Sequence, residues 1–222
     1  MFVDFHSHVL PQADHGSRSS DMSIAQLCEA KKAGVDTIVA TPHFYIERDS
    51  VDSFLERREA SYMRLMEKTE TDIKIIKAAE VRLDIGVSEL PDLEKLCIEG
   101  TSYILLELPE EPWQYWYFDF IEEIAETRGL SPIFAHVDRY SPHGREKLLS
   151  LGYTAQINAS ALLGPFRKKY YSKLIESGAV HVMGSDTHGN GEASYAAFSK
   201  AVSKLGPNME KLTLNSRKIL SL

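Results

Sequence analysis

The sequence is poor in cysteine, in long apolar runs and in excess basic charge, and each of these absences excludes a class of protein. Only two of its 222 residues are cysteines, Cys28 and Cys97, so we expect no disulfide framework but two small buried side chains in helical segments. No run approaches the roughly 20 apolar residues of a membrane span, and no apolar signal core follows the N-terminus. A formal net charge of −7 disfavours nucleic-acid binding, which needs a basic face. The expected location is therefore the cytoplasm.

Short apolar runs alternate with amphipathic segments along the whole chain. Hydrophobic residues make up 43% of the sequence and charged residues 26%, as in an ordinary globular domain. The strands are predicted at 2–5, 37–40, 73–78, 103–106, 132–135, 154–157 and 180–183, and the helical segments at 20–33, 51–68, 89–97, 115–127, 144–150, 167–177 and 194–205. Repeated strand–helix units predict an α/β fold with a parallel sheet closed into a barrel, formed by one domain over residues 1–222.

Histidines and carboxylates follow most of the predicted strands at the point where each strand ends. His6 and His8 come directly after the first strand, and residues two apart in a strand point to the same side. An open, doubly wound sheet would gather such side chains at one switch point. Their spread over many strands instead matches a barrel, whose active site lies at the carboxyl ends of its strands.

The candidate metal ligands at these strand ends are nitrogen and oxygen donors, without a thiolate. They are His6, His8, Asp14, His43, Glu80, Glu107, His136, Asp186 and His188. Such donors suit zinc, manganese or iron. The set exceeds the needs of one ion, so we expect two or three ions that share a bridging carboxylate.

The order of these residues resembles that of the polymerase and histidinol phosphatase (PHP) superfamily, with its strand-end His-x-His, two later histidines and closing Asp-x-His. The matching segments are DFHSH at 4–8, TPH at 41–43, AH at 135–136 and GSDTH at 184–188. Within the superfamily, HSHVLP at 6–11 followed by DHG at 14–16 is similar to the bacterial capsule-type, manganese-dependent protein-tyrosine phosphatases, as is ATPHF at 40–44.

The resemblance implies a distorted (β/α)7 TIM-like barrel, the PHP fold, with a trinuclear site in which manganese is expected and iron or zinc are alternatives. It assigns the first ion to His6, His8, Glu80 and Asp186. Glu80 would bridge to a second ion held by Glu107 and His136, while Asp14, His43 and His188 would hold the third.

Two further residues are candidates for catalysis. Arg139 lies one turn beyond His136, and its planar guanidinium matches two phosphate oxygens; a surface salt bridge to Asp138 is the alternative. His15 stands where the capsule-type branch commonly has aspartate, and it is either a phosphate contact, a support for the ligands or an ordinary loop histidine. We expect a metal-bridging hydroxide to attack phosphorus while the ions and Arg139 stabilise the developing charge.

The leading hypothesis is a metal-dependent phosphatase that acts on phosphotyrosine proteins, such as a bacterial tyrosine kinase, in exopolysaccharide synthesis. The alternative is a phosphatase for a small phosphomonoester such as histidinol phosphate, because residues 189–194 lack the basic residue that tends to follow the closing Asp-x-His in the capsule-type branch. An amidohydrolase or metal-dependent DNase would share the His-x-His but not the Asp14 loop or the closing motif. A non-enzymatic regulator would have to keep the whole ligand set without turnover. The oligomeric state stays open.

Overall fold

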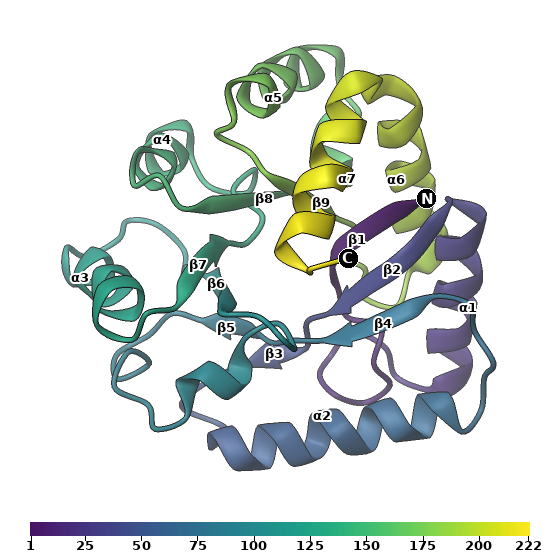
Figure 1. The fold of residues 1–222 in the computed structure, drawn as a ribbon, viewed down its shortest axis with the longest axis horizontal. Helices are drawn as coiled ribbons and strands as arrows, with labels where there is room; N and C mark the ends of the chain where they lie inside the picture. The colour runs from purple at the N-terminus through teal and green to yellow at the C-terminus, as the bar shows by residue number, and fades with distance from the viewer.

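The computed structural model describes residues 1–222, and its strands run parallel and lie side by side in chain order (Figure 1). The strands are β1 (Phe2–Ser7), β2 (Val35–Ala40), β3 (His43–Phe44), β4 (Lys74–Lys77), β5 (Glu80–Arg82), β6 (Tyr103–Glu107), β7 (Ser131–Phe134), β8 (Thr154–Asn158) and β9 (Val182–Gly184). β1, β2 and β4 form one sheet, and β3, β5, β6, β7, β8 and β9 form the other.

The two sheets join because two strands are kinked rather than ended. Pro42, which has no N–H to donate, separates β2 from β3. Main-chain bonds span both breaks: Ala78 N donates to Ala40 O (2.9 Å) and Glu80 N donates to Pro42 O (3.1 Å). β2 thus continues as β3 and β4 as β5, so the nine segments act as seven strands.

Hydrogen bonds between the ends of the first and last strands connect the two edges of this curled sheet. Asp186 N donates to His6 O (2.8 Å), and His8 N donates to Thr187 O (3.1 Å). The predicted distorted seven-stranded α/β barrel is confirmed.

The helices are α1 (Ser20–Lys32), α2 (Val51–Met66), α3 (Trp116–Glu122) with a π-helical turn at Glu123–Thr127, α4 (Pro142–Ser150), α5 (Pro165–Ser177), α6 (Gly191–Leu205) and α7 (Pro207–Ile219). Helices α1 to α6 lie around the outside of the curled sheet, whereas α7 crosses in front of β9 and ends over the barrel (Figure 1). Serine side chains accept main-chain N–H groups at the starts of α1, α2 and α4, as N-caps do. All seven α-helices are too short or too polar to span a bilayer.

Three sequence predictions were wrong in detail. The helix expected at 89–97 is only a 3₁₀ turn, Leu93–Leu96, because Pro91 and the left-handed backbone of Asp92 (φ 59°) interrupt it. Helix α7 was not predicted. Of the two cysteines, Cys97 is buried, although it follows that turn in extended backbone, whereas Cys28 lies on the exposed face of α1.

Two apolar layers support the site. The larger lies between the sheet and the helices. The smaller fills the barrel interior with alternate residues of the strands, such as Val3 and Phe5 of β1, and Leu220 beyond α7 completes it. Between Asp4 and Ser7 the pairing of β1 with β2 shifts register. Such an irregularity changes the direction of side chains at the end of a strand. His6 lies within the shifted segment.

Candidate metal centre

All nine predicted ligands gather at the carboxyl end of the barrel. They come from six places along the chain: the end of β1 and the loop after it, β3, β5, the end of β6, the residue pair after β7, and the loop after β9. Parallel pairing sets part of this arrangement, since His43 of β3 lies directly beside Glu80 of β5 in the ladder.

The carboxylate of Glu80 lies at the centre, surrounded by four imidazoles. Its Oε2 atom is 3.2 Å from Nε2 of both His6 and His8, and 3.0 Å from Nδ1 of His43. Its Oε1 atom is 2.8 Å from His136 Nε2. Glu80 is buried, and Oε2 has no hydrogen-bond partner. A buried carboxylate oxygen without a partner, faced by several imidazole nitrogens, fits a ligand shared between metal ions.

Three groups of donors surround this carboxylate closely enough to hold ions. His6, His8 and Asp186 form the first, and Asp186 Oδ1 lies 3.7 and 3.5 Å from the two histidine Nε2 atoms. His43, Glu80 and Glu107 form the second, which His136 joins at 3.4 Å from Glu107.

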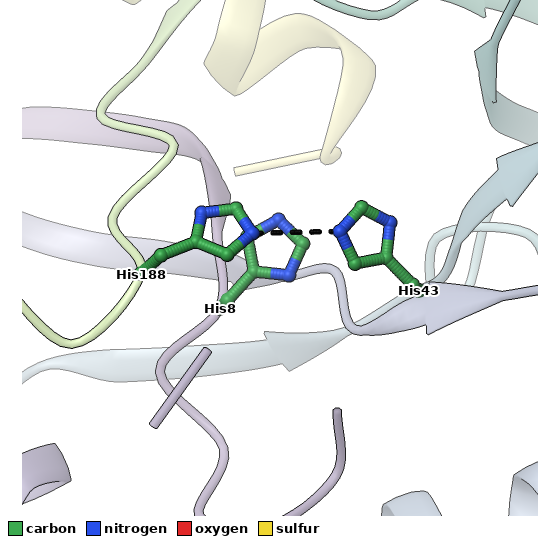
Figure 2. A group of neighbouring side chains, drawn as sticks. All are labelled: His8, His43 and His188. Atoms are coloured by element: carbon green, nitrogen blue, oxygen red, sulfur yellow. Dashed lines mark hydrogen bonds between the residues drawn. The ribbon is translucent and has the colours of Figure 1, made fainter. Parts of the chain in front are cut away.

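The third group is His8, His43 and His188, whose rings are drawn in Figure 2. The rings of His8 and His188 stack with centroids 3.9 Å apart, and Nε2 of His188 lies 3.4 Å from Nε2 of His43. Asp14, the remaining predicted ligand, adjoins this group: its Oδ2 atom lies 2.6 Å from His8 Nδ1 and accepts the main-chain N–H of His43 at 2.9 Å.

Neighbouring side chains orient the first two histidines. His8 donates its Nδ1 hydrogen to Asp14, and the Nδ1 atom of His6 lies 3.2 Å from the side-chain oxygen of Gln156. With Nδ1 engaged in this way, Nε2 of each ring is directed at the centre, which is the usual arrangement around a metal-binding histidine.

The cluster's charges are strongly coupled. Burial alone would raise the pKa of the Glu80 carboxyl, but His6 and His136 hold it well below its usual range. Burial alone would lower the pKa of His136, yet Glu107 and Glu80 raise it to about 9. At neutral pH the Glu80 carboxylate is thus ionised and attracts cations, either protons on the imidazoles or metal ions. Because a metal must displace those protons, its binding should strengthen as the pH rises.

The two predicted catalytic residues lie at the edge of the cluster. Arg139, whose side chain is 49% exposed, donates to the Asp186 carboxylate and not to Asp138, which accepts the N–H of Asn158 instead. His15 is exposed, and its ring stacks on that of His43 with centroids 4.7 Å apart and planes 8° apart.

Three supporting residues were not singled out from the sequence. Gln156 and Asn158 are amides in the otherwise apolar end of β8, two positions apart, and Asn158 Nδ2 donates to Asp186 at 3.0 Å. The signal was the one used for His6 and His8: polar residues at alternate positions of a buried strand. Asp4, part of the first motif, accepts the N–H of Ser185 at 2.7 Å and so ties β1 to the loop after β9.

The centre is open on two sides. A cavity of about 490 Å³ adjoins Glu107 and His136, and it is also lined by Arg82, Arg139 and Tyr140. A second cavity, of about 320 Å³, adjoins His15 and His43.

Comparison with known proteins identifies the family. Residues 2–215 match the family model described as capsular polysaccharide synthesis, CpsB/CapC. The chain belongs to this family. It is 30% identical to CapC of Staphylococcus aureus over 198 residues, which cover 84% of this chain and 76% of CapC. Tyrosine-protein phosphatase YwqE of Bacillus subtilis (strain 168) is 28% identical over 204 residues, covering 84% of this chain and 77% of YwqE. The resemblance to capsule-type phosphatases is therefore confirmed.

Solved structures agree. One match is a crystal structure described with YwqE of Bacillus subtilis and CpsB of Streptococcus pneumoniae, which are metal-dependent tyrosine phosphatases. The TM-score is 0.75 at 25% identity, and the match covers 99% of this chain and 94% of that one. Histidinol phosphate phosphatase of Lactococcus lactis matches with a TM-score of 0.52 at 16% identity, covering 92% and 94%. The second match supports the fold alone.

Proposed function

We propose that this protein is a metal-dependent phosphatase that hydrolyses phosphotyrosine in proteins. The observation that carries the proposal is the buried, unpartnered Glu80 oxygen among the imidazoles of His6, His8 and His43. The names of the relatives indicate the reaction. YwqE and CpsB are tyrosine-protein phosphatases, and both are described as metal-dependent.

The proposed metal site holds three divalent ions, with manganese first among the candidates and iron or zinc as alternatives. Its ligand sets are His6, His8, Glu80 and Asp186 for the first ion, Glu80, Glu107 and His136 for the second, and Asp14, His43 and His188 for the third. The nitrogen and oxygen donors support this choice of metals, and the contacts of Glu80 with donors of every set support its role as the bridge. One Asp14 carboxylate can both orient His8 and take part in the third set.

When bound, such ions would supply the positive charge and activated water that phosphomonoester hydrolysis requires. The protein's own residues do the rest. Arg139 is fixed beside Asp186 with its guanidinium half exposed, where it can donate to phosphoryl oxygens. Leu108, Pro109 and Tyr140 give the larger cavity an apolar wall for a phenyl ring. The exposed ring of His15 lies beside His188 in the smaller cavity, where it can contact a phosphoryl oxygen.

We further propose that residues 1–222 act as one catalytic domain in the cytoplasm, where an exposed free thiol such as Cys28 stays reduced. The protein substrate would then be a phosphotyrosine protein such as a bacterial tyrosine kinase. The family's link to capsular polysaccharide synthesis supports this setting.

Metal analysis combined with substrate kinetics tests the proposal. The protein reconstituted with manganese should hold more than one ion per chain and should turn over phosphotyrosine peptides and aryl phosphates faster than alkyl phosphates. At most one bound ion per chain would contradict the shared site. A clear preference for histidinol phosphate over phosphotyrosine in parallel assays would reassign the substrate to the small-molecule alternative.

A further inference from the structure

The cavity beside Glu107 and His136 contains two guanidinium groups, and they differ in what they contact. Arg139 donates to the Asp186 carboxylate. Arg82 lines the same cavity and is half-buried. Its guanidinium forms no ion pair or hydrogen bond with another residue and stacks on no aromatic ring. A cation in a concave site beside a metal centre attracts an anionic ligand. Arg82 is therefore the guanidinium that can bind an incoming anion without first leaving a carboxylate.

The strand geometry explains how Arg82 reaches this position. It lies two residues after Glu80, so both side chains leave β5 on the same face of the sheet, and Arg82 is the last residue of that strand. In the parallel ladder Arg82 lies beside Glu107 of β6.

The cavity is also lined by three carboxylates, those of Glu107, Glu110 and Glu111, and two of them have polar partners. Glu107 faces His136 at 3.4 Å, and Glu111 accepts the main-chain N–H of Ser141 at 3.0 Å. Glu110 is exposed at the rim. A phosphomonoester carries close to two negative charges near neutral pH, so the phosphoryl oxygens that face away from the proposed metal ions can accept hydrogen bonds from Arg82 as well as from Arg139.

We infer that Arg82 binds the non-bridging oxygens of the substrate's phosphoryl group and selects phosphomonoester dianions over monoanionic diesters. A guanidinium offers two parallel donors to two phosphoryl oxygens. The phenyl ring of the substrate would lie against Leu108, Pro109 and Tyr140, on the apolar wall of the same cavity. The inference rests on the proposed phosphatase function for its substrate, but anion binding tests it separately from turnover.

The experiment measures the affinity of manganese-loaded protein for inorganic phosphate and for dimethyl phosphate by calorimetry at about pH 8, where phosphate is a dianion. Arg82→Gln should weaken phosphate binding by about tenfold or more, as expected for a lost hydrogen bond between charged groups, and should change dimethyl phosphate binding less. Arg82→Lys keeps the positive charge but loses the two parallel N–H donors of the guanidinium, so we expect a smaller, severalfold loss of phosphate affinity. The matched control is Arg48→Gln, which removes a guanidinium that lines the other cavity and lies over the Tyr45 ring.

The inference is overturned if Arg82→Gln and Arg82→Lys both bind phosphate within twofold of the wild-type protein. It is also overturned if Arg82→Gln loses metal on elemental analysis, because Arg82 would then act through Glu80 or Glu107. Failure of the proposed function is a different result. In that case the wild-type protein would not cleave phosphotyrosine, but the Arg82 variants would still bind phosphate more weakly than the wild-type protein does. Active wild-type protein with unchanged phosphate affinity in the variants contradicts Arg82 alone.

Discussion

Replacing Glu80 with glutamine keeps the side chain's shape and removes its charge, and it should empty most of the metal site. The carboxylate lies within 2.8–3.2 Å of four imidazole nitrogens, from His6, His8, His43 and His136, and is buried. Removing one partner from a buried charge cluster costs about 3–5 kcal/mol. Each tenfold change in affinity corresponds to about 1.4 kcal/mol, so metal affinity should fall by roughly a hundredfold or more.

The assay is manganese reconstitution, removal of free metal by gel filtration, and elemental analysis, followed by phosphotyrosine kinetics on the same samples. Circular dichroism should be almost unchanged, because the apolar layers around the barrel do not involve this carboxylate. The control is Glu56→Gln, which changes an exposed glutamate of α2 in the same way. Full metal content and near-normal turnover in Glu80→Gln would refute Glu80 as the bridging ligand.

Three further predictions concern the same centre. Asp14→Asn weakens the acceptor for the His8 ring, so metal affinity should fall about 10- to 100-fold; an unchanged metal titration would contradict this role. Gly184→Ala should cost about 1–3 kcal/mol of unfolding free energy and release metal, because the new Cβ would lie 2.5 Å from the His6 Cβ, and wild-type stability in urea would disprove the clash. In metal-free protein, the raised pKa of His136 gives a stabilising contribution that is complete below the ordinary value of 6.5 and is lost as the pH rises through about 9. Denaturant midpoints that do not fall over this pH range in metal-free protein would contradict that contribution.

Strand ends and ligand types were predictable from the sequence because they depend on local pattern. A short apolar run followed by His6 and His8, or by Glu80, specifies both a buried strand and donors at its carboxyl end. In a parallel barrel those ends meet at one face whatever the loops do. The fold and the membership of the donor cluster therefore followed from one observation repeated along the chain.

Long-range partners and local interruptions were not predictable in the same way. The guanidinium of Arg139 meets Asp186, 47 residues away in the chain, and only the closure of the barrel brings them together. The kinks at Pro42 and before Glu80 depend on how neighbouring strands share main-chain bonds. Helix α7 was missed because the last helix was predicted to end at residue 205, yet Pro207 starts a new helix directly after Gly206, as proline often does in a first turn.

A hydrogen bond from the main-chain N–H of His136 fixes how the side-chain amide of Gln156 faces the His6 ring. The N–H of His136 is only a donor, so the Gln156 atom 2.5 Å from it must be the side-chain oxygen. That oxygen also faces His6 Nδ1 at 3.2 Å, and since it can only accept, Nδ1 carries a hydrogen and Nε2 faces the Glu80 carboxylate. The Gln156 nitrogen then donates to Asn158 Oδ1 at 3.0 Å, which turns Asn158 Nδ2 toward the Asp186 carboxylate, also at 3.0 Å. One directed chain of hydrogen bonds thus orients donors at the ends of β1, β7 and β9, which gives a physical reason for the two buried amides of β8.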